Sequence, residues 1–224
     1  GTERADIVCA PGNAGIAADV TVDSTLDQLN PAAVATFAAA GGFELVIVGP
    51  EAPLIAGVAD AVRDAGIAVF GPSQAAAALE GSKNFAKEVM AAAGVPTGLA
   101  RECNTIAEVE SAMDAFGAPY VIKADGLAAG KGVIVTSDRA AAIAHAEKFI
   151  DMGVLVEEFL DGQEVSLFFL SDGKSVLPLT PAQDFKRAFD GDAGPNTGGM
   201  GSYSPLPWLP AGFVDEVERT VAVP

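Results

Sequence analysis

The chain has little positive charge. Only 13 lysines and arginines stand against 30 aspartates and glutamates among 224 residues, which gives a formal net charge of −17. A nucleic-acid backbone is itself an anion, so a protein this acidic is not expected to bind one. A phosphorylated small molecule remains compatible with the composition, because its site needs only local positive charge. The charge balance therefore excludes one class of partner and leaves phosphate-bearing ligands open.

Cysteine, histidine and long apolar runs are also scarce. Cys9 and Cys103 are too far apart for a disulfide framework or a metal-binding spacing, so we expect both to be core thiols. The single histidine, His145, lies in an alanine-rich helical stretch and receives no catalytic role. No apolar run reaches the length that spans a bilayer, and no charged-then-apolar leader stands at the amino end. We therefore expect a folded cytoplasmic protein without a membrane partner.

The first third of the chain alternates strand and helix signals, which is typical of an α/β fold with parallel strands. Buried strands are predicted at 5–10, 43–48 and 67–70, with helices near 31–40 and 53–65. Ligands of open α/β sheets lie beyond the carboxyl ends of the strands. Glu51 follows such an end, where it would either contact a substrate hydroxyl or amine, or cap the next helix.

From Ser73 onward the pattern changes to an α+β unit dominated by antiparallel strands, and we place a domain boundary near Glu80. Helices are predicted at 82–93, with Ser82 as the N-cap, and at 139–150. Strands are predicted at 120–123, 132–135, 154–159, 165–170 and 175–179. The predicted fold class is thus α/β, with an N-terminal parallel-sheet domain followed by α+β lobes.

The most informative stretch is VIKADGLAAGKGVIV, residues 121–135, in which two apolar runs flank a loop carrying Lys123 and Lys131. Three glycines let this loop turn tightly and approach a ligand closely: Gly126, Gly130 and Gly132. The segment is not a P-loop, because Asp125 stands where the first glycine should be and a second strand follows instead of a helix. The pattern predicts a β-hairpin whose lysines bind phosphate.

Two later segments could also contact a ligand. Residues 154–164 run from an apolar strand into an acidic turn, where backbone groups could bond an adenine and a carboxylate could hold ribose hydroxyls; a solvated turn is the alternative. Residues 183–187 (QDFKR) precede a loop at 194–205 that is rich in glycine. The amides of such a loop can face a ligand, and we favour a functional loop over a structural one.

Six motifs, in the family's order, resemble the phosphoribosylamine–glycine ligases, also called glycinamide ribonucleotide synthetases. They are GPEAPL at 49–54, GPS at 71–73, LEGSKNFAK at 79–87, IKADGLAAGKGV at 122–133, VEEFLDGQEVS at 156–166, and QDFKR with GPNTGGMGSYSP at 183–187 and 194–205. The resemblance runs from about Pro11 to the C-terminus. It implies a Rossmann-like pre-ATP-grasp domain over 1–79 and an ATP-grasp region over 80–224, with a lid subdomain at about 101–160.

The resemblance also implies a reaction of purine biosynthesis. ATP would phosphorylate the carboxylate of glycine, and the amine of 5-phosphoribosylamine would attack the acyl phosphate. The products would be glycinamide ribonucleotide, ADP and phosphate, with Mg²⁺ or Mn²⁺ as the metal. A carboxylate is a poor acyl donor until its oxygen becomes a leaving group, and positioning with charge neutralisation does most of the work of phosphoryl transfer.

Each residue that matches a family motif receives a role by resemblance. Lys83 and Lys123 would bind the nucleotide phosphates, Glu157 and Leu160 would flank the adenine, and Glu164 would hold the ribose. The full nucleotide-binding set is Lys83, Lys123, Gly126, Gly130, Lys131, Gly132, Glu157, Glu158, Leu160 and Glu164. The catalytic candidates are Asp184, Lys186, Arg187 and Asn196, and the substrate-binding candidates are Glu51, Thr197, Gly198 and Gly199.

The chain also departs from the family pattern. Family members begin with a strand and a GNGGREH-like turn that stand before the first residue here, and they usually have more residues between Ile150 and Val154. The E-x-N segment that supplies the metal ligands would lie beyond Pro224, so metal ligands stay unassigned. We therefore expect these residues to be part of a longer protein. Two alternatives remain open: an ATP-grasp ligase for another acid and amine, and a non-catalytic nucleotide-binding module.

Overall fold

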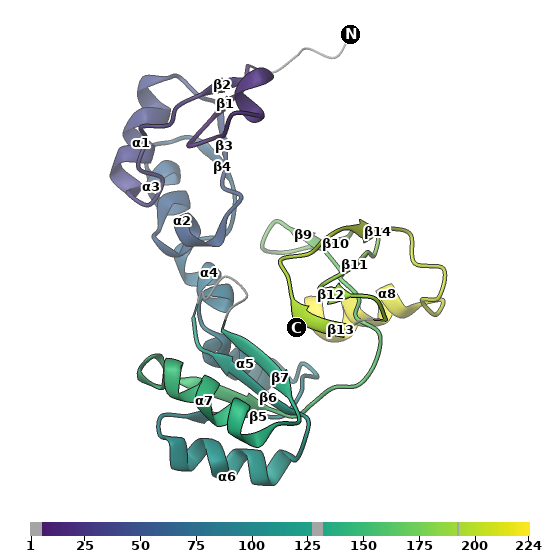
Figure 1. The fold of residues 1–224 in the computed structure, drawn as a ribbon. Coiled ribbons are helices and arrows are strands. Elements are labelled where there is room, and N and C mark those ends of the chain that lie inside the picture. The colour runs from purple at the N-terminus through teal and green to yellow at the C-terminus, as the bar shows by residue number, and fades with distance from the viewer. Residues whose placement is uncertain (1–5, 127–131, 192) are drawn as a thin grey trace. The chain divides into compact units, whose positions relative to one another are not determined.

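A computed structural model describes residues 6–126, 132–191 and 193–224. The chain divides into two compact units, Gly1–Ser82 and Lys83–Pro224, whose elements are labelled in Figure 1. Within the described ranges, no helix combines the length and the apolar character that crossing a bilayer requires.

The first unit contains two pairs of parallel strands with helices packed on them. Strand β1 (Val8–Cys9) pairs with β2 (Thr21–Val22), and β3 (Leu45–Ile47) pairs with β4 (Ala68–Phe70). The helical elements of this unit are η1 (Ile16–Ala18), α1 (Pro31–Ala40), α2 (Glu51–Ile55), α3 (Val58–Asp64) and α4 (Gln74–Gly81). The predicted α/β class with parallel strands is confirmed.

Local chemistry explains where these helices begin and end. The side chain of Asn30 accepts the amide of Ala33 at the start of α1, and Ser73 does the same for Ala76 at the start of α4. The single helix predicted at 53–65 is wrong, because Gly57 has a φ of 91° in the left-handed region and separates α2 from α3.

The core of the first unit lies on one side of the β3–β4 pair. Val46 and Val69 pack against buried helix residues that include Val58 and Val62. The alternate residues face away from this core, and Ile47 and Phe70 are 68% and 57% exposed. The prediction that these strands are buried is therefore wrong for one of their two faces. A strand presents successive side chains to opposite faces, so one helical layer covers only half of them.

The second unit begins with α5 (Lys83–Ala93) and contains a four-stranded sheet. Strands β5 (Ala100–Cys103), β6 (Tyr120–Ala124), β7 (Val133–Thr136) and β8 (Val154–Glu157) lie in the order β5-β8-β6-β7, and every neighbouring pair is antiparallel. Helices α6 (Ile106–Phe116) and α7 (Arg139–Phe149), with the short η2 (Ile150–Met152), complete this part (Figure 1). The predicted hairpin of β6 and β7 is confirmed.

The two faces of this sheet have different surroundings. Ile122, Val154 and Val156 form a buried cluster with side chains of α6 and α7. Because side chains alternate along a strand, Lys123 and Glu157 project from the opposite face. Helix α5 contacts that opposite face, since Asn84 Nδ2 donates to Glu102 Oε2 at 2.6 Å. One face is thus a core, and the other carries charged groups.

The remainder of the second unit consists of short antiparallel pairs. Strand β9 (Phe169–Ser171) pairs with β10 (Val176–Pro178), β11 (Gln183–Asp184) with β14 (Ser202–Tyr203), and β12 (Arg187–Phe189) with β13 (Ala193–Asn196); α8 (Phe213–Val217) and η3 (Glu218–Ala222) follow. The glycine-rich segment is therefore not all loop, because both of its ends pair with the QDFKR segment. A continuous strand was predicted at 165–170, and this prediction is wrong. Ser166 makes only an isolated bridge to Ala182, and β9 begins at Phe169.

Candidate functional site

Lys83 lies in the first turn of α5 and reaches the hairpin. Its Nζ donates to the carbonyl of Gly126 at 2.7 Å, and its backbone amide donates to Asp125 Oδ1 at 2.6 Å. Gly126 has a φ of 86°, which brings the chain out of β6 and directs this carbonyl to the ammonium group. The ammonium group of Lys83 therefore lies beside the start of the hairpin loop, where a phosphate could meet it, while the carboxylate of Asp125 occupies the first amides of α5.

Lys123, Glu157 and Lys87 form a second charged group on the same face of the sheet as α5. Lys123 Nζ lies 2.7 Å from Glu157 Oε2, and Lys87 Nζ lies 3.6 Å from Glu157 Oε1. Glu157 is only 9% exposed and belongs to the buried end of β8. A buried carboxylate needs such partners, because an unpaired one would be too costly to desolvate. Lys123, which was predicted to bind phosphate, is thus paired with Glu157, which was predicted to flank the adenine.

The hairpin loop itself is described only at its ends. The amide of Ala124 donates to the carbonyl of Gly132 at 2.7 Å, which continues the pairing of β6 and β7 up to the loop. Gly126 and Gly132 therefore bracket the loop as predicted. Gly130 and Lys131 lie outside the described residues.

The residue that follows β8, Glu158, is hydrogen-bonded to Leu99, the residue that precedes β5. The amide of Glu158 donates to the carbonyl of Leu99 at 3.0 Å, and Glu158 Oε1 accepts the amide of Leu99 at 2.7 Å. Leu160 follows as an exposed apolar side chain. An exposed leucine after a fixed strand end could cover one side of a flat base, so the adenine role of Leu160 stays a prediction.

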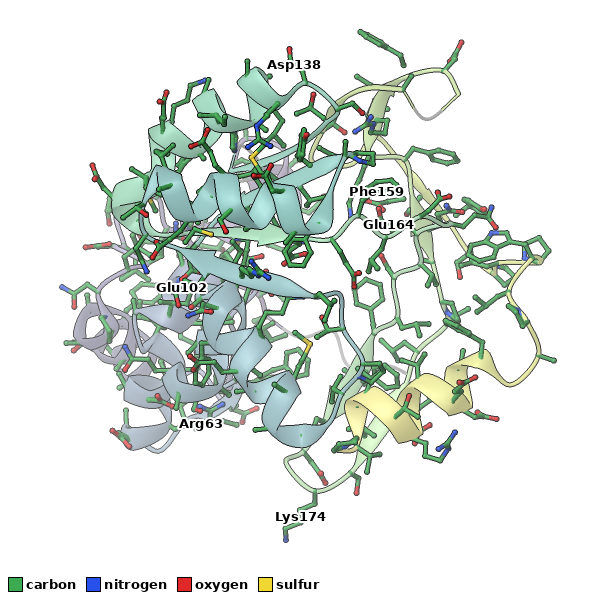
Figure 2. All side chains as sticks on the ribbon, turned by 90° about the horizontal axis from the view of Figure 1, so that it is seen from below. Arg63, Glu102, Asp138, Phe159, Glu164 and Lys174 are labelled. Carbon is green, nitrogen blue, oxygen red and sulfur yellow. The ribbon has the colours of Figure 1, made fainter. Side chains whose placement is uncertain are left out.

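Glu164 forms an ion pair with Lys186, although the two residues were predicted to serve the ribose and the acyl transfer separately. The labelled Phe159 and Glu164 mark the segment that follows β8 in Figure 2. Lys186 Nζ also lies 3.7 Å from Asp184 Oδ1. The hydrogen bond to Glu164, opposed by partial burial, raises the pKa of Lys186. This lysine therefore stays charged through the neutral range.

Backbone bonds hold the glycine-rich loop on the QDFKR segment. The amide of Met200 donates to the carbonyl of Phe185, the amide of Phe185 donates to the carbonyl of Gly201, and the amide of Thr197 donates to the carbonyl of Lys186, at 2.7 to 2.9 Å. Arg187 and Asn196 are paired in register between β12 and β13. The structure thus brings together the predicted catalytic and substrate-binding residues of the second unit: Asp184, Lys186, Arg187, Asn196, Thr197, Gly198 and Gly199.

Glu51 belongs to the first unit and is the first residue of α2, and residues 48–50 separate it from the end of β3. Its side chain is exposed. The N-cap of α2 is Pro50, so the alternative that Glu51 caps this helix is wrong. An acidic side chain in the first turn still interacts favourably with the helix dipole. A contact with substrate stays a prediction.

Sequence reasoning missed two residues of this site. Asp125 was noticed only as a departure from the P-loop, yet its carboxylate binds the start of α5. Lys87 received no role, although it lies one helical turn after Lys83 and so on the same face of α5. The four-residue spacing of the two lysines was the signal that could have identified it.

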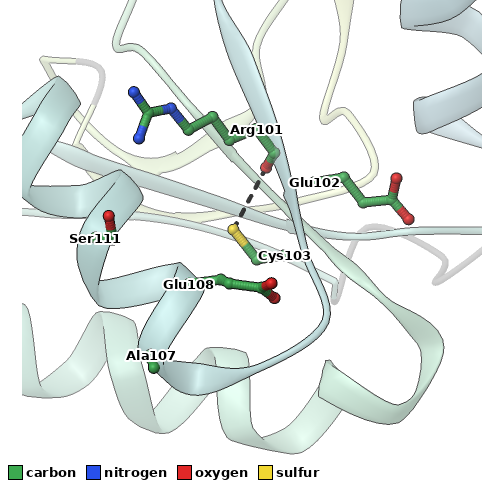
Figure 3. A pocket seen from close by; sticks show the side chains of 6 residues that line it. All are labelled: Arg101, Glu102, Cys103, Ala107, Glu108 and Ser111. Atoms are coloured by element: carbon green, nitrogen blue, oxygen red, sulfur yellow. Dashed lines mark hydrogen bonds between the residues drawn. The ribbon is translucent and has the colours of Figure 1, made fainter.

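A shallow pocket of about 320 Å³ lies elsewhere in the second unit, between β5 and α6 (Figure 3). Its lining residues are Arg101, Glu102, Cys103, Ala107, Glu108 and Ser111. Cys103 Sγ donates to the carbonyl of Arg101 at 3.6 Å, and burial raises the pKa of this thiol. A protonated thiol is a poor nucleophile, and the pocket contains none of the predicted site residues, so we assign it no role.

Comparisons with known proteins match both units of the chain. Residues 2–80 match the family model of the phosphoribosylglycinamide synthetase N domain, and residues 81–224 match that of the phosphoribosylglycinamide synthetase ATP-grasp (A) domain. A phosphoribosylamine–glycine ligase of Leifsonia xyli subsp. xyli is 71% identical over 99% of this chain and 54% of its own length. That of Streptomyces coelicolor is 65% identical over 96% of this chain and 51% of its own length.

A solved structure of the same kind of ligase also matches this chain. The crystal structure of a phosphoribosylamine–glycine ligase from Thermotoga maritima superposes with a TM-score of 0.75 and 31% identity, over 96% of this chain and 53% of the other. The chain spans about half the length of the relatives it matches. Because two consecutive family domains cover it almost from end to end, the chain belongs to the phosphoribosylglycinamide synthetase family.

Proposed function

We propose that this chain provides the ATP-binding part, and a portion of the sugar-amine site, of a phosphoribosylamine–glycine ligase. The single observation that carries the proposal is the match to the N domain and the ATP-grasp domain of that family in consecutive order. Such a ligase would work in the cytoplasm, where ATP and the phosphorylated sugar are found.

ATP would bind on the face of the sheet that carries α5. Lys83 and Lys123 would contact the phosphates, and the loop between Gly126 and Gly132 would cover them. The adenine would bind at the end of β8, next to Glu158 and Leu160. A covering loop also excludes water, which would protect an acyl phosphate from hydrolysis.

Acyl transfer would occur at the glycine-rich loop. ATP would transfer its γ-phosphoryl group to the carboxylate of glycine, and the amine of 5-phosphoribosylamine would then attack the acyl carbon and displace phosphate. Lys186 and Arg187 provide positive charge for these anions, while Thr197, Gly198 and Gly199 provide a loop fixed by backbone bonds. Glu51 would serve the sugar-amine site of the N domain.

A magnesium or manganese ion would assist this reaction. Among the described residues, no group of three histidine, cysteine, aspartate or glutamate side chains is arranged to hold a metal ion. We therefore assign no metal ligand and no step through a metal to this chain. The E-x-N segment of the family remains the expected source of these ligands.

The test measures ADP release by the natural protein that contains this chain, with Mg-ATP and with glycine or 5-phosphoribosylamine omitted in turn. We expect release only when both substrates are present, and we expect Lys123→Ala to abolish it. ATP binding without stimulation by either substrate would contradict the proposed ligase. Stimulation by a different acid and amine would assign the fold to another ATP-grasp reaction.

A further inference from the structure

The carboxylate of Glu157 is shared between two lysines from different elements. Lys123 comes from β6 and approaches Oε2 at 2.7 Å, while Lys87 comes from α5 and approaches Oε1 at 3.6 Å. The side chains of Lys87 and Lys123 are 18% and 31% exposed, so Lys87 is the more enclosed of the two. The two lysines therefore differ in how far they can reach a ligand.

Lys87 is held in place by its other contacts. Its Nζ donates to Thr97 Oγ1 at 2.8 Å and to the carbonyl of Gly98 at 2.7 Å. The carboxylate of Glu157 lies at ion-pair distance from the same ammonium group. Lys87 is thus fixed between α5, the segment after it and the end of β8, which leaves it little freedom to follow a ligand.

The charges of the three groups do not cancel. Glu157 with Lys123 alone would form a neutral, partly buried pair, and the lysine would gain little by leaving it. With Lys87 present the group carries a net positive charge, and the carboxylate is already partly neutralised. Attraction between charges is strong in a partly buried site, so this second cation weakens the hold of Glu157 on Lys123.

We propose that Lys87 is a positioning residue for nucleotide binding: by sharing Glu157, it leaves the charge of Lys123 available to the phosphates of ATP. The inference rests on the proposed function in one respect, namely that the ligand of this face is a nucleoside triphosphate. It adds to the family resemblance a lysine for which the sequence motifs supplied no role. Lys87 acts through Glu157 and is not itself expected to contact the ligand.

The test compares ATP with adenosine, because only ATP carries the groups that Lys123 would contact. Isothermal titration calorimetry on the natural protein that contains this chain gives the dissociation constant of each ligand. We expect Lys87→Met to raise the dissociation constant of ATP about tenfold, which corresponds to roughly 1.4 kcal/mol, and to leave that of adenosine unchanged. Lys148→Met, an exposed lysine of α7, is the matched control and should change neither.

A double variant distinguishes a positioning role of Lys87 from a role in packing alone. In Lys87→Met/Glu157→Gln the carboxylate is removed together with its second cation, so Lys123 is again free. The ratio of ATP affinity to adenosine affinity, in which any contact of Glu157 with the adenine cancels, should therefore recover. A role in packing alone would predict a further loss. If Lys87→Met does not fold, Lys87→Gln keeps a donor for the carbonyl of Gly98 and should show the same selective loss of ATP affinity.

The outcomes distinguish the inference from the proposed function. Three outcomes would overturn the role of Lys87 and leave the proposed function intact. They are an equal loss of ATP and adenosine binding, unchanged ATP binding, and no recovery in the double variant. Failure of the unsubstituted protein to bind ATP would overturn the proposed function itself.

Discussion

Asp125 binds the first turn of α5, the helix that contains Lys83. Its Oδ1 accepts the amide of Lys83 at 2.6 Å and the amide of Asn84 at 3.3 Å, across 42 and 41 residues of sequence. The bonds stabilise the start of the helix as an N-cap would, but the acceptor comes from the end of β6. The helix that supplies one predicted phosphate lysine is thereby fixed to the hairpin that supplies the other.

Replacement of Asp125 by alanine should therefore affect both stability and binding. Loss of an acceptor at a helix start costs about 1 kcal/mol of unfolding free energy, which urea denaturation measures. Because Lys83 would no longer be fixed to the hairpin, the dissociation constant of ATP should rise as well.

Asp138→Ala is the matched control for this substitution. Asp138 Oδ1 accepts the amides of Ala140 and Ala141 at the start of α7. This variant should lose a similar amount of stability and keep its ATP affinity. If the two variants bind ATP equally well, the link between Asp125 and the nucleotide site is wrong.

Glu164 should determine whether the protein distinguishes ATP from 2′-deoxy-ATP. A carboxylate that accepts a ribose hydroxyl contributes about 1.5 to 3 kcal/mol, or roughly tenfold or more in affinity. We expect the unsubstituted protein to prefer ATP by that factor, and Glu164→Ala to remove the preference. Asp161→Ala, an exposed acid of the same turn, should preserve it. A preference that survives Glu164→Ala would place the ribose elsewhere.

Glu108 should make the stability of the second unit depend on pH. Its Oε2 accepts the amide of Asn104 at 2.8 Å, and the capping box with Thr105 adds to this, so the pKa of Glu108 is held below its ordinary value of 4.5. A lowered pKa in the folded state gives stability above the unfolded value, and this stability is lost as the pH falls through the folded value.

The measurement is the urea midpoint of Glu108→Gln and of the unsubstituted chain from pH 7 to pH 3. The variant should be less stable at pH 7, and the difference should shrink as the pH falls below 4.5. Glu110→Gln, an exposed acid of the same helix, serves as the comparison. A difference that stays constant with pH would show that the carboxylate charge is not involved.

Cys103 should react more slowly with iodoacetamide than Cys9. Cys103 is 1% exposed and burial raises the pKa of its thiol, whereas Cys9 is only half-buried, so the prediction that both are core thiols is wrong for Cys9. Mass spectrometry of the two peptides after brief alkylation measures the rates. Both should react alike in urea, and equal rates in the folded protein would contradict this assignment.

Much of the fold could be predicted because local signals were strong. Helix α1 was predicted near 31–40 and extends over Pro31–Ala40. The cap at Asn30 and the glycines after Ala40 explain its ends. The β6–β7 hairpin followed from two apolar runs around a glycine loop. Strand β5 and helix α6 were missed, although Thr105 and Glu108 form a capping box that identifies the start of α6.

The site could be predicted residue by residue but not as a set of contacts. The motifs indicated Lys123, Glu157, Glu164 and Lys186 separately, whereas the ion pairs among them join segments up to 34 residues apart. Such pairings depend on how separate strands and loops are placed in three dimensions, which local sequence patterns do not show. The partner of Glu164 and the role of Asp125 therefore became visible only in three dimensions.

The alternation of side chains along β6 and β8 separates two kinds of evolutionary constraint. Ile122 and Val156 face the helices, and substitutions there should lower the yield of folded protein without changing its affinity for a ligand. Lys123 and Glu157 are their immediate neighbours on the other face, and substitutions there should change affinity more than folding. At these two pairs of neighbouring positions, selection for stability and selection for function therefore act on adjacent residues of the same strand.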